Sequence, residues 1–374
     1  MIDAADAWAA CEQAGLRFWT GVPDSLLAEL SASIEAHAEG GSHVIAANEG
    51  GAVAIALGRH LATGEVCGVY LQNSGLGNAV NPLVSLADPA VYGIPLVLVI
   101  GWRGEPGTRD EPQHRRQGET TLDLLRTLGV PTRVAGDDLR TFEDDVSWAV
   151  TTGSERAGPV ALVVRAGTFT AGLSAPEPAP AELPFREDAL AALVGALPGD
   201  AAVVATTGKT SRELYELRDR SGAPQRDFLT IGGMGHASQI ALGVALAKPG
   251  RRVCALDGDG ALVMHMGSLA VIGQHAPPNL LHVVLHNGAH ESVGGQPTPT
   301  ERLDVAALAL AAGYRRADTV DRLDAIAEAV SALCAEDGPT LLEVRIRQGS
   351  RPDLGRPEDA PSVMRERFMS WLGR

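Results

Sequence analysis

The stretch Arg251–Ala261, which reads Arg-Arg-Val-Cys-Ala-Leu-Asp-Gly-Asp-Gly-Ala, decides the fold of this chain. Its apolar part is typical of a strand buried on both faces of a parallel sheet, and its polar, glycine-rich end predicts a turn into a helix over 264–274. A second apolar strand is expected over 279–285, followed directly by polar residues. Asp259 and Asn287 are therefore expected at the carboxyl ends of two neighbouring strands, one crossover apart.

These two side chains offer the hard oxygen ligands that magnesium prefers. Gly258 and Gly260 would let backbone N–H groups approach a ligand closely, and Ala261 leads toward a helix N-terminus, which favours a diphosphate. The alternative for the Asp-Gly-Asp-Gly run alone is a plain turn between strand and helix. An asparagine at the end of the next strand favours the metal site over that alternative.

A zinc site is the rival interpretation of the same region, because His286 and His290 are four residues apart and Glu291 is adjacent. That spacing would place both imidazoles on one face of a helix. However, the intervening Asn-Gly-Ala follows a strand and is a poor helix interior, so we disfavour zinc.

A lone carboxylate stands in the run Ala46-Ala-Asn-Glu-Gly-Gly-Ala52, after an apolar strand expected over 43–47. Glu49 has only small or uncharged neighbours there, and the flanking glycines leave space for a ring to approach. A dry pocket of this kind raises the pKa of a carboxyl group. The alternative is a solvated loop glutamate.

Apolar runs alternate with helix-length segments along the whole chain, which predicts an α/β protein with parallel sheets covered on both faces. Four prolines interrupt the pattern within 173–187 and predict a linker. We therefore expect two doubly wound parallel-sheet domains, 1–172 and 188–374, with no third domain between them. The expected strands are 43–47, 66–71, 94–100, 159–165, 201–206, 252–256, 280–285 and 340–346, with helices over 52–61 and 237–247 and a polar loop over 101–118.

Composition limits the classes of function. Hydrophobic residues make up 45% and charged residues 21% of the chain, which is typical of a folded protein. A net charge of −15 argues against nucleic acid as a partner. No apolar run approaches a membrane span, the N-terminus has no basic leader, and the four cysteines are far apart. These features predict a cytoplasmic protein with no membrane partner.

The Asp-Gly-Asp-Gly run with its distant Asn, Glu49 before small residues, and Ile231-Gly-Gly-Met-Gly-His236 together resemble the thiamine-diphosphate enzymes. This resemblance implies the thiamine-diphosphate-binding fold, a thiamine diphosphate cofactor and Mg²⁺. It implies that Glu49 is catalytic, because it would hydrogen-bond the cofactor's aminopyrimidine and promote removal of the thiazolium proton. The resemblance further implies the metal ligands Asp259, Asn287 and the Ala289 carbonyl, and cofactor contacts from Glu49, Ser74, Gly75, Gly232, Met234, Gly258, Asp259, Gly260, Ala261 and Asn287.

The resemblance also bears on assembly. It places Glu49 in a pyrimidine-binding domain, 1–172, and the metal ligands in a diphosphate-binding domain, 188–374. In the resembled class the two halves of one site come from different subunits, which implies an obligate homodimer or a larger homo-oligomer.

The two-domain architecture, with no middle domain, resembles that of the phosphonopyruvate and sulfopyruvate decarboxylase families. The motifs that carry this resemblance are Gly21-Val-Pro-Asp-Ser25, Ser74-Gly-Leu-Gly-Asn78, Gly101–Gly107, Asp110–His114, Thr206–Glu213 and Arg351–Pro357. The last two favour the phosphonate family. The implied reaction converts 3-phosphonopyruvate to phosphonoacetaldehyde and CO₂ in phosphonate biosynthesis.

A small anionic 2-oxo acid needs cationic donors, and this acidic chain concentrates them at expected strand ends. The candidate substrate residues are Asp24, Ser25, Arg103, His114 and Lys209, with Asp24, Ser25 and His114 also candidates for proton handling. Arg109, Arg115 and Arg116 are more simply interpreted as solvated surface charges.

Two departures from the resembled class stand out. The paired histidines of many pyruvate-type decarboxylases are absent, and His286 stands where Asp or Asn is usual. Sulfopyruvate decarboxylation and thiamine-dependent carboligation remain alternatives. A nicotinamide dehydrogenase is disfavoured, because no Gly-x-Gly-x-x-Gly opens a helix and Gly75-Leu-Gly77 lacks the third glycine.

Overall fold

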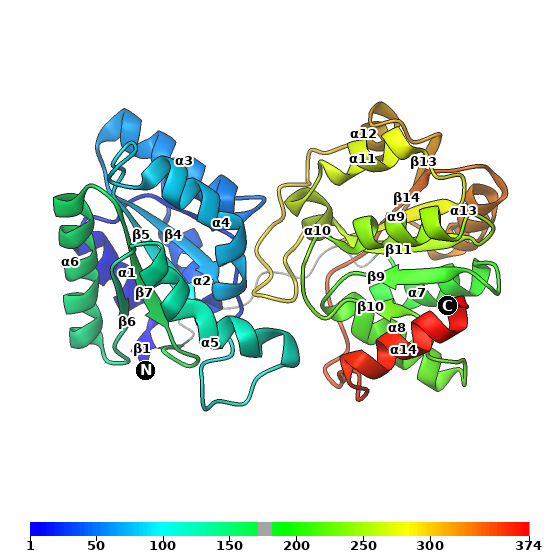
Figure 1. Cartoon of the computed structure of the whole chain (residues 1–374), viewed down its shortest axis with the longest axis horizontal. Helices are drawn as coiled ribbons and strands as arrows, with labels where there is room; N and C mark the ends of the chain where they lie inside the picture. Colours follow the sequence, from blue (N-terminus) through cyan, green and yellow to red (C-terminus); the bar gives the residue numbers. More distant parts are fainter. Residues whose placement is uncertain (171–181, 374) are drawn as a thin grey trace. The chain divides into compact units, whose positions relative to one another are not determined.

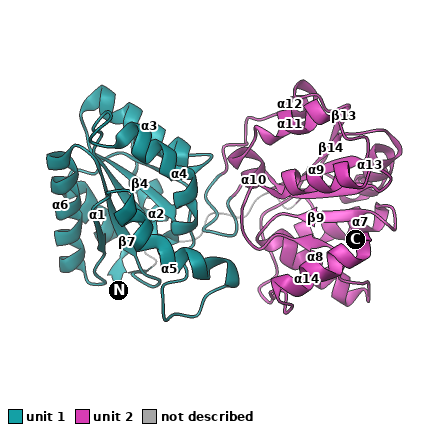
Figure 2. Cartoon of the chain, in the orientation of Figure 1, with its two compact units in different colours: residues 1–176, 290–297 teal, residues 177–289, 298–374 magenta. Residues whose placement is uncertain are grey.

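The computed structural model describes residues 1–170 and 182–373. The chain forms two compact units: unit 1 comprises Met1–Pro176 with His290–Pro297, and unit 2 comprises Glu177–Ala289 with Thr298–Arg374 (Figure 2). Most of the expected linker, 173–181, lies outside the described residues. Its last two residues, Arg186 and Glu187, form the first turn of helix α7 (Arg186–Ala196).

Unit 1 is built on a six-stranded, fully parallel sheet with the order β3-β2-β4-β5-β7-β6 (Figure 1). The central strands are almost wholly apolar and buried, as expected for a sheet covered on both faces. The strands are β2 (Trp19–Gly21), β3 (His43–Ile45), β4 (Cys67–Gln72), β5 (Leu96–Gly101), β6 (Thr132–Val134) and β7 (Pro159–Val164), and a separate pair joins β1 (Ile2–Asp3) to β8 (Phe169–Thr170).

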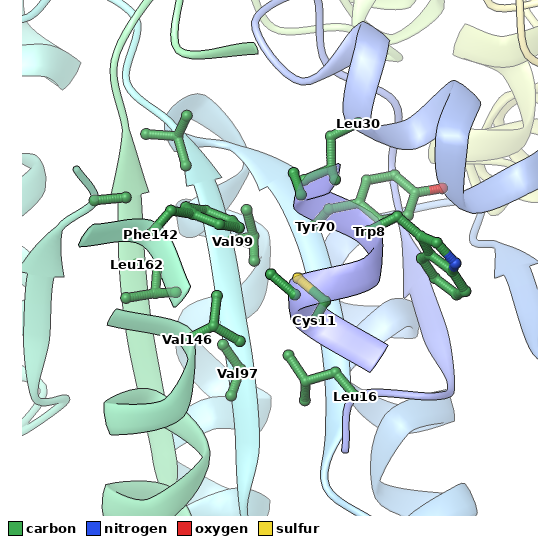
Figure 3. Close-up of a cluster of buried hydrophobic side chains, with 14 of the residues drawn as sticks. Trp8, Cys11, Leu16, Leu30, Tyr70, Val97, Val99, Phe142, Val146 and Leu162 are labelled. Carbon is green, nitrogen blue, oxygen red and sulfur yellow. The ribbon is translucent and has the colours of Figure 1, made fainter. Parts of the chain in front are cut away.

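Helices cover both faces of this sheet and enclose two apolar cores. Helices α1, α2 and α6 pack on one face, where Cys11, Phe142 and Val146 meet Val97 and Val99 of β5 (Figure 3). Helices α3, α4 and α5 pack on the other face. The helices are α1 (Ala4–Gln13), α2 (Ala28–His37), α3 (Glu49–Thr63), η1 (Asn73–Gly75), α4 (Leu76–Pro82), η2 (Leu83–Ala87), α5 (Pro112–Thr127) and α6 (Leu139–Arg156).

Unit 2 repeats this plan with a second six-stranded parallel sheet, ordered β10-β9-β11-β12-β14-β13. One apolar core lies under α7, α8 and α13, and another lies under α9, α11 and α12. The elements are β9 (Ala202–Ala205), α8 (Lys209–Arg220), β10 (Phe228–Leu229), α9 (Ala237–Ala247), β11 (Val253–Gly258), α10 (Asp259–Met264), α11 (Ser268–His275), β12 (Leu280–His286), α12 (Val305–Ala311), β13 (Arg316–Val320), α13 (Leu323–Ala335), β14 (Thr340–Arg345) and α14 (Pro361–Leu372).

The two sheets have the same topology. In each, the first strand lies between the second and the third, so the strand order reverses beside it. Ligands of open α/β sheets bind beyond the carboxyl ends of the strands at such a reversal. The reversal lies between β2 and β4 in unit 1 and between β9 and β11 in unit 2, and these four strand ends are where a site is expected.

The predicted fold class is confirmed, with local corrections. The helix expected over 264–274 is two helices, α10 and α11, separated by residues 265–267. The loop expected over 101–118 ends earlier, because α5 begins at Pro112, a residue suited to a first helical turn. Within the described residues no helix is long and apolar enough to cross a membrane.

A buried ion pair fastens the first helix of unit 2 to its neighbour. Arg186 of α7 donates from Nε to Glu213 Oε2 of α8 at 2.8 Å, and the two side chains are 6% and 1% exposed. We expect Glu213→Ala to lower the free energy of unfolding by about 3–5 kcal/mol, because it removes the carboxylate that pairs with the buried charge of Arg186.

Chemical denaturation monitored by circular dichroism would measure this change. Arg365→Ala is the matched control, since the Arg365–Glu366 pair of α14 is 57% and 46% exposed and should contribute about 0–1 kcal/mol. Equal losses in the two variants would contradict the role assigned to the buried pair.

Candidate active site

Glu49 is the first residue of α3 and is only 6% exposed. Asn48 caps the helix by accepting a hydrogen bond from Gly51 N at 2.8 Å, which fixes the chain at this point. Asn78 donates from Nδ2 to Glu49 Oε2 at 2.7 Å. Burial raises the pKa of Glu49 above its ordinary value, and the Asn78 hydrogen bond offsets the rise only in part. Glu49 is therefore a buried carboxyl group and not a solvated loop residue.

Gly75 is required for this placement. A Cβ atom built on Gly75 would lie 2.2 Å from Glu49 Oε1, a distance that no side chain tolerates. Two residues further, a Cβ on Gly77 would meet no described atom within 4 Å. The backbone at the carboxyl end of β4 thus approaches the Glu49 carboxyl group directly.

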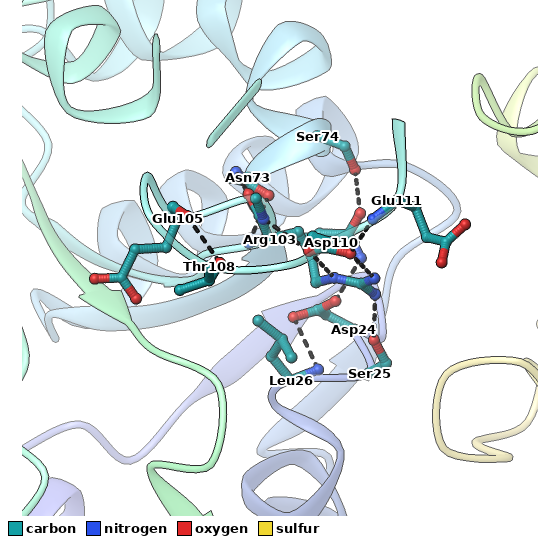
Figure 4. Close-up of polar contacts among 12 residues, drawn as sticks. Asp24, Ser25, Leu26, Asn73, Ser74, Arg103, Glu105, Thr108, Asp110 and Glu111 are labelled. Carbon is teal, nitrogen blue, oxygen red and sulfur yellow. Dashed lines mark hydrogen bonds and ion pairs between the residues drawn. The ribbon is translucent and has the colours of Figure 1, made fainter. Parts of the chain in front are cut away.

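Asp24 follows β2 at the strand-order reversal of unit 1 and is fully buried. Figure 4 shows its polar surroundings. Gln72, the last residue of β4, donates from Nε2 to Asp24 Oδ1 at 2.6 Å, and Ser74 Oγ donates to Gln72 Oε1 at 2.7 Å. A Cβ on Gly101 would lie 1.9 Å from Asp24 Oδ2. Burial raises the pKa of Asp24, and this effect outweighs the hydrogen bond from Gln72 and the charge of Arg103.

Arg103 joins the same polar cluster through a bidentate ion pair. It donates from Nε and Nη2 to Asp110 at 2.8 and 2.5 Å, and from Nη1 to Ser25 Oγ at 3.1 Å (Figure 4). Burial tends to raise the pKa of Asp110, but the Arg103 hydrogen bonds hold it below its ordinary value. Burial, followed by the charge of Arg103, lowers the pKa of His114 on α5. Asp24, Ser25 and Arg103 therefore belong to one polar cluster, and the charges of Arg103 and Asp110 act on His114.

In unit 2, Asp259 follows β11 and is 2% exposed. Thr298 and Thr300 donate from Oγ1 to the same carboxylate oxygen, Oδ2, at 2.5 and 3.0 Å. Oδ1 accepts no hydrogen bond from the described part of the chain. One oxygen is thus fixed by hydroxyl donors while the other is open, an arrangement that fits a carboxylate binding a metal through one oxygen.

Asn287 follows β12, the neighbour of β11, so its backbone reaches the same sheet edge as Asp259. Its Oδ1 accepts a hydrogen bond from Ala289 N at 3.1 Å, across a turn in which Gly288 has φ of 69°. The side chain of His286, directly before Asn287, is buried and contacts Glu343 and Thr300. Among the described residues no group of three or more His, Cys, Asp or Glu side chains is placed to hold a metal ion, so the zinc alternative gains no support.

The remaining predicted residues lie at or near carboxyl ends of unit 2 strands. Lys209 opens α8, directly after Gly208 at φ of 96°, beyond the end of β9. Met234 lies after β10 between two glycines of positive φ, and it is not part of the buried core. A Cβ on Gly258 would meet no described atom within 4 Å, so the backbone at this strand end is open on that side.

Several polar partners are not predicted from the sequence. Gln72 directly follows the expected strand 66–71, and Asn78 lies in α4, and neither position shows by itself that the side chain bonds Asp24 or Glu49. Thr298 and Thr300 follow Asn287 in a segment without periodicity, and nothing in the sequence pairs them with Asp259. Glu343 had a usable signal, since it is the one carboxylate within the otherwise apolar run Thr340–Val344.

Comparison with known families gives a match in each of the two units. The N-terminal TPP binding domain of thiamine pyrophosphate enzymes matches residues 4–125, and the C-terminal TPP binding domain matches residues 206–344. These matches define the chain's class as a thiamine pyrophosphate enzyme that uses this cofactor.

Curated relatives align with nearly the whole chain. Phosphonopyruvate decarboxylase from Streptomyces viridochromogenes is 39% identical over 387 residues, which cover 100% of this chain and 95% of the relative. The enzyme of the same name from Streptomyces hygroscopicus is 38% identical, covering 98% and 93%. Sulfopyruvate decarboxylase from Methanosarcina acetivorans is 30% identical, covering 84% and 85%. The chain belongs to the family of thiamine-pyrophosphate-dependent decarboxylases that contains the phosphonopyruvate decarboxylases.

The close approach of Gly75 to Glu49 can be tested with a matched pair of substitutions. Gly75→Ala should displace the Glu49 carboxyl group and reduce decarboxylase activity roughly 10²-fold, as misplacement by about 1 Å typically does. Gly77→Ala should retain activity and raise stability by about 0.5–1 kcal/mol, because alanine favours the helix. Steady-state kinetics and denaturation of both variants would measure this. Full activity in Gly75→Ala would refute the required approach.

The burial of Asp24 has a consequence that depends on pH. Because its pKa is raised, the folded state binds the proton more tightly than the unfolded chain does, and stability falls as pH rises through the raised pKa. This penalty is absent below the ordinary pKa of 3.8. Asp24→Asn cannot ionise, so its unfolding free energy relative to the native chain should increase as pH rises above the ordinary pKa of 3.8 and through the raised pKa of Asp24. Urea denaturation across this range would show it, and a difference that does not vary with pH would contradict it.

Proposed function

We propose that this chain decarboxylates 3-phosphonopyruvate to phosphonoacetaldehyde and CO₂, using thiamine diphosphate and Mg²⁺, as a step of phosphonate biosynthesis. The observation that carries the proposal is the buried carboxyl group of Glu49, whose pKa burial raises, in a chain alignable end to end with two phosphonopyruvate decarboxylases. The 30% identical sulfopyruvate decarboxylase makes sulfopyruvate the nearest competing substrate.

The residues of unit 2 fit the cofactor's charged end. Asp259 Oδ1, the side chain of Asn287 and the carbonyl of Ala289 would hold Mg²⁺, and the backbone at Gly258, Gly260 and Ala261 would receive the diphosphate. Gly232 and Met234 would contact the rings. When bound, the thiazolium ring supplies the electron sink that accepts the electron pair left by departing CO₂.

Glu49 acts on protons rather than on the substrate. Its buried carboxyl group would hydrogen-bond a ring nitrogen of the aminopyrimidine, and the raised pKa lets it hold or release a proton near that nitrogen. Ser74 and Gly75 belong to the same strand end and would contact the cofactor.

The substrate carries a carboxylate and a phosphonate, and the product gains one proton where the carboxylate leaves. Lys209 and His114 are the candidate anion contacts. Arg103 remains a candidate as well, although its bidentate pairing with Asp110 reduces the net charge that it presents. Asp24 and Ser25 are the candidates for delivering the proton, since the raised pKa of Asp24 favours its protonated form.

The proposed working form is a homodimer or a larger homo-oligomer with sites shared between subunits. Separate α and β subunits occur in related sulfopyruvate decarboxylases, and the β subunit from Methanothermobacter thermautotrophicus aligns with 49% of this chain. That division supports a requirement for both kinds of unit in one site.

The proposal is tested by following CO₂ release from phosphonopyruvate, sulfopyruvate and pyruvate side by side. We expect phosphonopyruvate to be preferred and Glu49→Gln to lower kcat/KM by about 10²- to 10⁴-fold, because the amide cannot exchange the proton. Glu35→Gln, on α2 and outside the site, is the control and should keep full activity. Preference for sulfopyruvate would overturn the substrate, and full activity of Glu49→Gln would overturn the role of Glu49.

A further inference from the structure

A chain of buried polar contacts leads away from Asp259 into the interior of unit 2. Thr300 Oγ1 donates to Asp259 Oδ2 at 3.0 Å and lies 2.9 Å from His286 Nε2. His286 Nδ1 lies 2.6 Å from Glu343 Oε1 on β14, and Thr319 Oγ1 of β13 donates to Glu343 Oε2 at 2.9 Å. The contacts thus cross from the end of β11 over β12 to β14 and β13.

The residues in this series of contacts are almost completely shielded from water. Thr300 is 0% exposed, Glu343 is 1% exposed and His286 is 5% exposed. Burying a carboxylate in an apolar sheet is costly unless each oxygen has a partner. Glu343 meets that condition, because His286 and Arg345 contact Oε1 while Thr319 donates to Oε2. A sheet that only needed stability would be better served by apolar residues at these positions.

These contacts fix the orientation of the Asp259 carboxylate. A carboxylate can turn about its Cβ–Cγ bond and present either oxygen, but the hydroxyls of Thr298 and Thr300 both hold Oδ2. The Thr300 hydroxyl is itself held by His286, and the His286 ring is held by Glu343. Oδ1 is consequently the oxygen that remains for a ligand.

We propose that Thr300, His286 and Glu343 are positioning residues that orient the Asp259 carboxylate and thereby set the metal affinity of the site. They do so without contacting metal, cofactor or substrate. The inference rests on the proposed function insofar as Asp259 is taken as a metal ligand. It also gives His286 a role where an Asp or Asn is usual in the resembled class.

The test compares three threonine variants of the full-length protein saturated with thiamine diphosphate. Mn²⁺ serves as the probe, and the free ion is counted by its electron paramagnetic resonance signal during titration. Thr300→Val should weaken Mn²⁺ binding by about 10- to 100-fold, as loss of an outer partner of a metal ligand typically does. Thr300→Ser keeps the hydroxyl and should restore affinity to within a few-fold of the native value.

Thr340→Val is the matched control, because Thr340 on β14 is equally buried and its hydroxyl has no hydrogen-bond partner within the described residues. It should leave Mn²⁺ affinity unchanged. Native affinity in Thr300→Val, or an equal loss in Thr340→Val, would overturn the proposal.

If Thr300→Val does not fold, Glu343→Gln tests the same series of contacts at the residue farthest from Asp259. It should weaken Mn²⁺ binding by a smaller factor, and native affinity in this variant would also overturn the proposal. Failure of the proposed function gives a different result: the native protein itself would bind no Mn²⁺ with thiamine diphosphate. Because the readout is metal binding, it does not depend on which oxo acid the enzyme accepts.

Discussion

The burial of carboxyl groups at the ends of parallel strands is the constraint on which both units depend. An isolated carboxylate is unstable away from water, so each buried one needs either a proton or a set of donors. In unit 1, burial raises the pKa values of Glu49 and Asp24. Amide side chains donate hydrogen bonds to these two carboxyl groups, and no cation forms an ion pair with either of them among the described residues. In unit 2, threonine hydroxyls donate hydrogen bonds to the Asp259 carboxylate, and the His286 imidazole contacts the Glu343 carboxylate.

These two ways of stabilising a buried carboxyl group suit two different chemical roles. A carboxyl group with a raised pKa keeps its proton to higher pH than an ordinary carboxyl group, whereas a carboxylate with one oxygen fixed can receive a cation. Asp24 and Asp259 follow strands at equivalent reversals of the same strand order, β2 in unit 1 and β11 in unit 2. The repeated architecture therefore supplies equivalent places for chemistry, and the local side chains decide what each place does.

The sequence predicts the long buried strands, and the structure confirms them. It also singles out Glu49 and Asp259, whose roles stay predictions. Both features leave strong local patterns in the sequence. The short strands β1, β2, β6, β8, β10 and β13 are not predicted, since runs of two to five residues carry too little periodicity. The break between α10 and α11 was missed because Gly267 is compatible with either outcome. Partners such as Thr300 and Glu343 depend on tertiary contacts across three strands, and local patterns do not encode those.

The contact between Asp24 and Gly101 also bears on how this family can diverge. Because Gly101 has no side chain, the end of β5 can lie against a fully buried carboxyl group. A lineage that replaced this glycine would have to withdraw the carboxyl group as well, so the two positions are expected to change together or not at all. The pair Asp24 and Gly101 therefore offers a simple sequence criterion for separating relatives that retain this polar pocket from those that have adapted the same scaffold to another use.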